Sequence, residues 1–452
     1  MFLLPIVFGA DRGTRTPDPR ITNALLYQLS HIGVFTTGRK GTSFFLNRQR
    51  FRKKSFATIH RLIIFLYICT AMKTFLTILA AFSTLCVLGG DFPVMERKTL
   101  SWPLPDGNYM LTVTLGSKRR AASTTVRCES RRLLCENFVT KKGQITAISF
   151  LVNKHSPVIS ATERVKIKKR EETKLNWDDV LSVEITGDNP AVIDIRIVPD
   201  TVRPTIYLCG NSTVVDQDEE PWASWGQMLP RFLNENIAVA NYAESGETAS
   251  TFCSALRFKR ILKDLKAGDF VFMEFGHNDQ KQRFPGAGAW YNFTHTLKTM
   301  IDEVRQRGAT PVLVSPTQRR SFKDGRIQET HADYPEAMEV LARREGVTFI
   351  DLHAYTRTMF EAWGEEGSKR AFVHYPANTY PGQTKALADN THFNPYGAYE
   401  ICKCVLHGLK EQGLLTQYMR DFTDFDPAHP DPVERFHWTE SEHIDIVKPD
   451  GN

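Results

Sequence analysis

The sequence predicts an α/β protein in which a three-layer α/β/α domain with a parallel five-stranded sheet follows an all-β sandwich-like domain. Two patterns favour this fold class. Residues 92–200 contain short segments with a two-residue apolar period, separated by turn residues. From about residue 204, short apolar runs alternate with helical patterns. The length of 452 residues is about three times that of a typical domain, so the chain has room for both parts.

Composition and charge favour a globular protein. Hydrophobic residues make up 42% of the chain, aromatic residues 11% and charged residues 24%, which is enough apolar surface for sizeable cores. The net charge of +6 is uneven, because residues 1–71 hold 11 of the 57 basic residues and 2 of the 51 acidic ones. The rest has 46 basic and 49 acidic residues, a net charge of −3. We therefore expect no nucleic-acid partner.

The first ninety residues do not read as a domain. Residues 1–71 have no sustained apolar period and resemble a recurrent spurious translation found upstream of genes, so we expect a start at Met72. Residues 72–90 then have the basic start, apolar run and small-residue exit of a secretory signal peptide. We expect an exported protein, periplasmic or extracellular. Each apolar run is shorter than the roughly 20 residues that span a bilayer, so no stable membrane association is expected after processing.

The cysteines allow one expected bridge. In an exported protein, Cys128 and Cys135 are the most plausible disulfide partners, since they lie close together between two strand-like runs. Cys209 lies within an apolar run and is expected to be a buried thiol. Cys402 and Cys404 lie two apart on a predicted helix and so point to different faces. Without a partner set at zinc spacing, no structural metal is expected.

Six segments predict the β-sandwich of residues 92–200. They are rich in Val, Ile and Thr, and glycine- and asparagine-containing turns separate them. The segments are YMLTVTLG, STTVRCE, ITAISFLVN, ERVKIKKRE, LSVEITG and AVIDIRIV. The role of this domain stays open between carbohydrate binding and packing. Because every candidate catalytic residue lies after Pro204, we expect the domain to be dispensable for the chemical step.

Residues 204–418 predict the α/β/α domain, and residues 419–452 an extended C-terminal tail. Five short apolar runs have the composition of buried parallel strands. These runs are Thr205–Cys209, Ile237–Tyr242, Phe270–Phe275, Pro311–Ser315 and Val347–Leu352. Helices are expected between them, one starting after Asp333 and stopping at Gly346, and another stopping at Gly308. Such a sheet places its ligands at the carboxyl ends of the strands.

Polar, glycine-bearing blocks follow these strands and predict acyl-transfer chemistry. They are GNST at 210–213, ESGE at 244–247, GHND at 276–279 and DNTH at 389–392. A serine hydroxyl needs a base, and an imidazole held by a carboxylate can supply it, so Ser212, His392 and Asp389 are the candidate catalytic residues. The backbone N–H groups of Ser212 and Gly246 and the amide of Asn278 are candidate oxyanion donors.

Each candidate also has an ordinary structural interpretation. Ser212 and His392 could cap helices, Gly246 could be a left-handed turn residue, and Asn278 could satisfy backbone groups of a turn. His277 is more consistent with a wall or structural residue than with a second base. The combination of blocks, rather than any one residue, favours catalysis.

The four blocks, in this order and at these separations, resemble those of the SGNH (GDSL-like) hydrolases. The stretches WASWGQMLPRF, THADYPEAMEVLA and ALADNTHFNPYGAYEIC are similar to rhamnogalacturonan acetylesterases of carbohydrate esterase family twelve. Asn211 stands where that family more often has Asp, which implies altered hydrogen bonding rather than an inactive site. The resemblance implies removal of acetate from an acetylated pectic polysaccharide or oligosaccharide, with no metal and no cofactor.

Two other functions stay open: an SGNH esterase or lysophospholipase on another acyl ester, and a non-catalytic glycan-binding protein. Charged rather than apolar loops near the site disfavour the first, and the complete triad disfavours the second. Several side chains near the strand ends could stack on sugar rings or bind carboxylates, although packing roles are equally consistent. These are Trp222, Trp225, Trp290, Tyr380 and the pair Arg319–Arg320.

Overall fold

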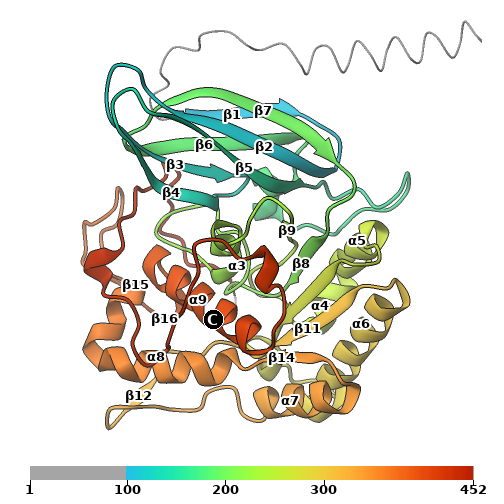
Figure 1. Ribbon diagram of the computed structural model, residues 1–452. Coiled ribbons are helices and arrows are strands. Elements are labelled where there is room, and N and C mark those ends of the chain that lie inside the picture. Colours follow the sequence, from blue (N-terminus) through green and yellow to red (C-terminus); the bar gives the residue numbers. More distant parts are fainter. Residues whose placement is uncertain (1–97, 451–452) are drawn as a thin grey trace, which may run out of the picture. The chain divides into compact units, whose positions relative to one another are not determined.

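The computed structural model describes residues 98–450, so the expected leader and the extension before it lie outside the described residues (Figure 1). The strands are β1 (Lys98–Pro103), β2 (Gly107–Gly116), β3 (Ala122–Cys128), β4 (Arg132–Thr140), β5 (Ile145–Lys154), β6 (Val180–Asn189), β7 (Val192–Asp200), β8 (Thr205–Cys209), β9 (Ala238–Asn241), β10 (Phe270–Glu274), β11 (Thr310–Val314), β12 (Phe322–Lys323), β13 (Arg326–Ile327), β14 (Thr348–Ile350), β15 (Phe372–Tyr375) and β16 (Leu387–Phe393). The α-helices are α3 (Trp225–Met228), α4 (Ala249–Ser254), α5 (Arg257–Asp264), α6 (Thr294–Gln306), α7 (Tyr334–Glu345), α8 (Leu352–Gly367) and α9 (Pro395–Glu411). None of the described helices is long and apolar enough to cross a membrane.

The five predicted parallel strands form one end of a larger sheet. Its order is β14-β11-β10-β8-β9-β5-β2-β7, and the pairs among β14, β11, β10, β8 and β9 are all parallel. The predicted parallel five-stranded sheet is therefore confirmed. It continues into the β region, because β5 pairs with β9 in parallel at Val152 and Val239.

Helices cover both faces of the parallel strands, which gives the three layers expected from the sequence (Figure 1). Alternate strand residues point to opposite faces, as the two-residue strand period requires. Ile206 and Leu208 of β8 pack in one core with α3, α8 and α9. Tyr207 and Cys209 pack in the other core with α4, α5, α6 and α7.

Within residues 98–200, a second sheet lies over β2, β5 and β7. Four antiparallel strands in the order β1-β6-β3-β4 enclose a third core between the two sheets. This is the predicted sandwich, although β1 and β4 were not predicted and ERVKIKKRE does not form a strand. That stretch makes one isolated bridge at Arg164 and a 3₁₀ turn over Lys169–Glu171, because its polar residues pack against the α/β part.

The expected disulfide does not form. Cys128 and Cys135 are buried free thiols on neighbouring strands. The register pairs Cys135 with Val126, whereas Cys128 stands opposite Arg132. The two cysteines are therefore not cross-strand partners, and this prediction was wrong.

The C-terminal residues pack across the α/β part, as an extended tail was expected to do. They contain a 3₁₀ turn at Val433–Arg435, and Phe425, Phe436 and Trp438 pack against the core that holds α3 and α9. Further along, Ile444 bridges to Glu220 in the loop before α3. The chain end is thereby brought close to the carboxyl edge of the sheet.

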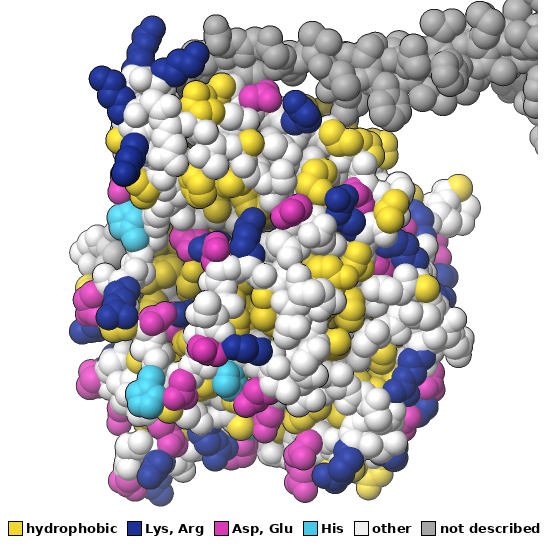
Figure 2. Space-filling model, in the orientation of Figure 1, with side chains coloured by type: hydrophobic (Ala, Val, Ile, Leu, Met, Phe, Trp, Pro, Cys, Tyr) yellow, Lys and Arg dark blue, Asp and Glu magenta, His cyan; other side chains and the backbone are white. Residues whose placement is uncertain are grey.

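Surface charges of both signs are interspersed over the α/β part (Figure 2). Basic side chains gather at the upper left of this view, over the loops that join β2 to β3 and β4 to β5. The exposed basic residues of these loops are Lys118, Arg119, Lys141 and Lys142. This end of the sandwich is therefore more basic than the rest of the face shown.

Candidate active site

Ser212, His392 and Asp389 lie together at the carboxyl edge of the sheet. Ser212 follows β8 in a turn whose residues Val214 and Val215 donate backbone hydrogen bonds to the carbonyl of Asn211. Its Oγ lies 2.9 Å from Nε2 of His392, and Nδ1 of His392 lies 2.8 Å from Oδ2 of Asp389. Because an ionised carboxylate can only accept, Nδ1 carries the proton and Nε2 is free to accept from the serine hydroxyl.

Asp389 and His392 belong to the short strand β16. β16 pairs with β15, and its end is held by a bridge between Phe393 and Ala223. The other carboxylate oxygen of Asp389 accepts from the backbone N–H of His392 at 3.0 Å. Burial would raise the pKa of Asp389, but hydrogen bonds from the ring and backbone of His392 outweigh it and hold this pKa below its usual range. The carboxylate is thus fixed in its ionised form.

The three candidate oxyanion donors come from turns that touch one another. Gly246 has φ = +81°, a conformation that favours glycine, and Asn278 Nδ2 donates to the carbonyl of the next residue, Glu247, at 3.0 Å. This bond uses one of the two amide protons of Asn278. Within residues 98–450, the backbone N–H groups of Ser212 and Gly246 donate to no protein acceptor. These donors stay available to a developing oxyanion.

Comparison with known proteins matches this site to a family. The GDSL-like Lipase/Acylhydrolase family pattern matches residues 208–398. The rhamnogalacturonan acetylesterase RhgT of Bacillus subtilis is 40% identical over 212 residues, which is 46% of this chain and 90% of that protein. The chain belongs to the GDSL-like hydrolases.

Two further comparisons report similar proteins. The rhamnogalacturonan acetylesterase of Emericella nidulans is 26% identical over 257 residues, covering 52% of this chain and 97% of that protein. The crystal structure of YxiM from Bacillus subtilis is 24% identical, covers 70% of this chain and 80% of that chain, and superposes with a TM-score of 0.43. The protein is a carboxylic ester hydrolase related to rhamnogalacturonan acetylesterases.

Two buried carboxylates that the sequence did not single out hold the turns of this GDSL-like hydrolase. Asp279 accepts from the N–H groups of Gly276 and Ala249, both at 2.9 Å, and so ties the GHND turn to α4. Glu274, at the end of β10, accepts from Thr213 Oγ1 at 2.8 Å, directly beside Ser212. Asp279 belongs to the GHND block and Glu274 to the apolar run before it, but the sequence did not reveal their partners.

Asn211 keeps its turn closed without a carboxylate. Its Oδ1 accepts from the backbone N–H of Thr213 at 3.1 Å, and lies 3.0 Å from Thr213 Oγ1, whose proton is donated to Glu274. Its Nδ2 is buried and has no hydrogen-bond partner among the described residues. The altered hydrogen bonding relative to an Asp at this position stays a prediction.

Three of the aromatic side chains proposed to meet sugar rings are buried. Trp222, Trp225 and Tyr380 are at most 7% exposed. Trp222 instead packs edge-on against the ring of His392, with centroids 5.8 Å apart. Of the four aromatic residues singled out in the sequence, only Trp290, at 45% exposed, is open to a ligand. For the other three the packing alternative holds, because hydrophobic packing determines their burial and their local sequence does not reveal it.

The two residues of the basic pair Arg319–Arg320 also differ in burial. Arg320 is largely buried and donates to Ser368 Oγ and Asn390 Oδ1, both at 3.0 Å. Arg319 is half-buried and donates to the carbonyl of His277 at 3.0 Å. Burial lowers the pKa of Arg319. Arg319 thus lies beside the GHND turn, whereas Arg320 is a structural residue.

The β region and the chain end both contact the catalytic edge. Arg170 donates to the carbonyl of Ser245 at 2.8 Å, next to Gly246, and forms an ion pair with Asp450. Lys448 Nζ lies 3.3 Å from Oδ2 of Asp389. The wall of this site is therefore built from three distant parts of the chain.

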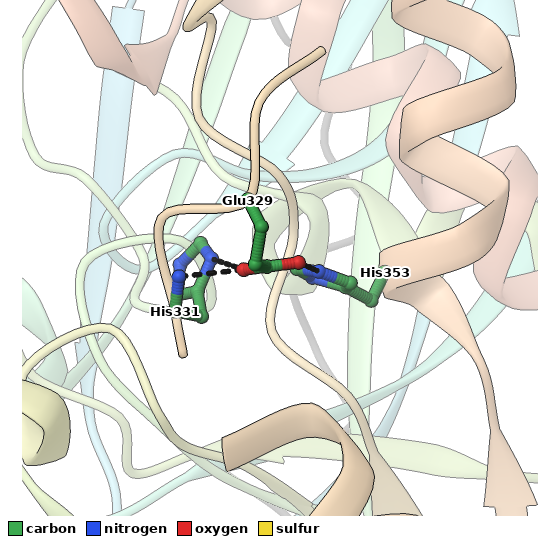
Figure 3. Close-up of side chains that lie close together, drawn as sticks. All are labelled: Glu329, His331 and His353. Atoms are coloured by element: carbon green, nitrogen blue, oxygen red, sulfur yellow. Dashed lines mark hydrogen bonds and ion pairs between the residues drawn. The ribbon is translucent and has the colours of Figure 1, made fainter. Parts of the chain in front are cut away.

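A second polar cluster consists of Glu329, His331 and His353 (Figure 3). It adjoins the GHND turn through His331, which contacts His277. Their ligand atoms lie within 4.8 Å of one another, so these residue types could hold a metal ion. Glu329 Oε2, however, binds His353 Nε2 at 2.8 Å and Arg357 Nη2 at 3.1 Å. A cation would have to displace this guanidinium, so the contacts favour a structural network.

His277 joins this network rather than the catalytic residues. Its Nδ1 lies 3.0 Å from His331 Nε2, and its Nε2 lies 3.0 Å from Thr317 Oγ1. Burial holds the pKa of His277 well below its usual value. With both ring nitrogens engaged, His277 supports the turn that carries Asn278.

Proposed function

We propose that this hydrolase is a serine esterase that removes acetyl groups from a pectic polysaccharide, with acetylated rhamnogalacturonan as the substrate. The hydrogen-bonded chain from Ser212 through His392 to Asp389 carries the proposal of a serine mechanism. The substrate class is supported by the 40% identity to an acetylesterase of that name, which the chain covers over 90% of its length.

In the first half-reaction, Ser212 Oγ attacks the carbonyl carbon of the acetyl ester while His392 Nε2 takes the hydroxyl proton. The carbonyl oxygen becomes an oxyanion that accepts from the N–H groups of Ser212 and Gly246 and from Asn278 Nδ2. When the intermediate collapses, the bond to the sugar oxygen breaks and His392 returns the proton to that oxygen. The sugar leaves as an alcohol, and the acetyl group stays on Ser212.

In the second half-reaction, a water molecule replaces the sugar. His392 takes a proton from the water as its oxygen attacks the acetyl carbon, and the same donors hold the oxyanion. Collapse releases acetate and returns the proton to Ser212. Asp389 stays ionised throughout and holds the imidazole in the orientation that both steps need.

The substrate is tested by measuring acetate release from acetylated rhamnogalacturonan, acetylated xylan, an aryl acetate and a long-chain aryl ester. We expect the highest kcat/KM on the rhamnogalacturonan among the two polysaccharides, and little turnover of the long-chain ester. Faster release from xylan, or preference for the long acyl chain, would assign the protein to another ester. Absence of turnover on all four would favour a glycan-binding protein.

The mechanism is tested with Ser212→Ala, His392→Ala and the double variant. Each single change should lower kcat on the aryl acetate by several orders of magnitude, and the double variant should be scarcely slower, because the two residues act as one unit. Circular dichroism controls for folding. Wild-type turnover in Ser212→Ala, or trapping of the acyl group on another residue, would contradict the assignment.

We also propose that the protein is exported to the periplasm or outside the cell after cleavage near Gly90. The charge break after residue 71 and the apolar run that follows support this. N-terminal sequencing of the exported protein tests it, and a mature chain that begins before Met72 would contradict it.

A further inference from the structure

A pocket of about 620 Å³ opens beside the turn that carries Asn278. It is lined by the loop after β10, by residues 287–291 ahead of α6, and by residues 332–334 at the start of α7. The lining residues that matter here are Gln280, Arg283, Phe284, Trp290, Tyr291 and Asp333. Its volume is within the range of about 300–1,000 Å³ that is usual for small-molecule sites.

Three aromatic rings on this pocket are exposed. Phe284 is 48%, Trp290 45% and Tyr291 69% exposed, and they are the only aromatics among the large exposed hydrophobic side chains of residues 98–450. We call these three residues the aromatic platform. Clustered exposed apolar surface of this kind marks a binding site, because leaving it in water has a free-energy cost. Aromatic faces beside polar groups suit the apolar faces of sugar rings.

The loop under the platform is held in place. Gln282 donates to Thr248 Oγ1 and Ser250 Oγ at 3.1 and 3.0 Å, and Asn292 Nδ2 donates back to Gln282 Oε1 at 2.8 Å. Gly288 has φ = +154°, and a Cβ there would come within 2.9 Å of the Tyr291 ring. The ring therefore packs directly on the backbone, so the platform is formed before a ligand binds.

Arg283 gives the pocket a cation without a carboxylate partner. Its Nη1 donates to the carbonyls of Gln280 and Gln282, at 2.8 and 2.9 Å. No described carboxylate forms an ion pair with it, although Asp333 lines the same pocket. A guanidinium with free donors matches the geometry of a carboxylate, which a uronic acid carries.

The pocket adjoins the turn that carries Asn278. Gln280 lies two residues after Asn278, and the hydroxyl of Tyr334, also in the lining, donates to the carbonyl of Asp279 at 3.1 Å. The platform and the proposed oxyanion donor Asn278 therefore both belong to the segment that follows β10.

We propose that the aromatic platform and Arg283 form a binding subsite for neighbouring sugars of an acidic polysaccharide. Trp290 and Tyr291 stack on pyranose rings, and Arg283 pairs with a uronate carboxylate. This inference rests on the proposed function, because it places the unreacted part of the same substrate chain. Binding there holds the polymer but takes no part in the attack on the ester.

Binding is measured by titration calorimetry on the full chain carrying Ser212→Ala, with de-acetylated rhamnogalacturonan oligosaccharides as the probe. Adding Trp290→Ala and Tyr291→Ala should raise the Kd by about tenfold or more, since two stacking contacts are lost. The control pair Val139→Ala and Val202→Ala truncates apolar side chains that are also exposed but lie outside the pocket, and should leave the Kd unchanged.

Arg283→Gln tests the charge. It should weaken binding of the acidic oligosaccharide by about two- to fivefold, as expected for an exposed ion pair, and leave binding of a carboxyl-reduced oligosaccharide unchanged. If Arg283→Gln weakened binding of both oligosaccharides equally, Arg283 would not pair with a uronate carboxylate.

Kinetics with Ser212 intact separate this inference from the proposed function. The Trp290→Ala/Tyr291→Ala variant should raise KM on acetylated rhamnogalacturonan and keep its kcat/KM on an aryl acetate. An unchanged Kd and KM in this variant would overturn the subsite even if the wild type releases acetate. Conversely, platform-dependent binding by a wild type that releases no acetate would retain the subsite and reject the proposed function.

Discussion

The two side-chain amide protons of Asn278 have different acceptors in the proposed mechanism. One proton is donated to the carbonyl of Glu247 at 3.0 Å, which fixes the GHND turn against the turn of Gly246. The other is left for an oxyanion. The side chain therefore both supplies a donor and sets the spacing of two donors. A buried amide can do this because its two protons point in directions fixed by one plane.

Asn278→Ala should lower kcat on an aryl acetate by about 10²–10³-fold with little change in KM, because the lost donor acts on charge that develops in the transition state. Steady-state kinetics measure the effect. Asn234→Ala is the matched control, since that amide also donates to a backbone carbonyl, that of Gln417 at 3.0 Å, away from the site. A loss confined to KM, or an equal loss in the control, would reject the oxyanion role.

Strand β10 ends in Glu274, whose carboxylate contacts the turn that carries Ser212. Glu274 accepts from Thr213 Oγ1 and from the indole N–H of Trp225, and is 1% exposed. Burial raises its pKa to about 7, although the hydrogen bonds from Trp225 and Thr213 lower it in part. Strand β10 thus supports the turn of β8 through a group that titrates near neutral pH.

This raised pKa predicts how stability depends on pH. Between about pH 4.5 and 7 the unfolded chain loses this proton and the folded chain keeps it, so the free energy of unfolding should fall as pH rises, by about 3 kcal/mol in total. Glu274→Gln cannot ionise and should lack this loss. Urea unfolding of both proteins at pH 5 and pH 8 measures this loss. We expect the free energy of unfolding of the variant, relative to that of the wild type, to be higher at pH 8 than at pH 5. The same difference at both pH values would contradict the assignment.

On the scale of the whole molecule, the β region is built into the hydrolase. Arg132 of β4 is fully buried and pairs with Asp216 at 2.6 Å, in the loop that follows the nucleophile turn. The adjacent Arg131 pairs with Glu220, which also accepts a hydrogen bond from Trp438 in the C-terminal tail. Because β5 also pairs with β9, removing residues 98–200 would expose a sheet edge and leave both carboxylates without their arginine partners. A truncated chain is therefore not expected to fold. The expectation that the β domain is dispensable applies to the chemical step and does not extend to folding.

Arg132→Met should lower the free energy of unfolding by about 3–5 kcal/mol, because it leaves the buried Asp216 without its partner. Chemical denaturation measures the change. Arg326→Met is the matched control: its pair with Glu361 is exposed and should contribute less than about 1 kcal/mol. Comparable losses in both variants would mean that the two regions are not coupled through this pair.

The sequence by itself determined the elements whose signals are local. The five buried strands follow from short β-branched runs, α7 from Asp333 and Gly346 at its ends, and the start of α9 from Asn394 and Pro395. Three of the four polar blocks follow strands of the parallel sheet and indicated the candidate site, because parallel strands end at one edge. The fourth, DNTH, lies within β16, which is outside that sheet.

Only the tertiary structure decided which distant segments meet. It joined β5 to β9, buried Trp222 against His392, left Trp290 exposed, and brought Lys448 to Asp389. None of these contacts has a local period or a motif. Each depends on how separate cores pack, and packing is set by the summed burial of residues far apart in the chain.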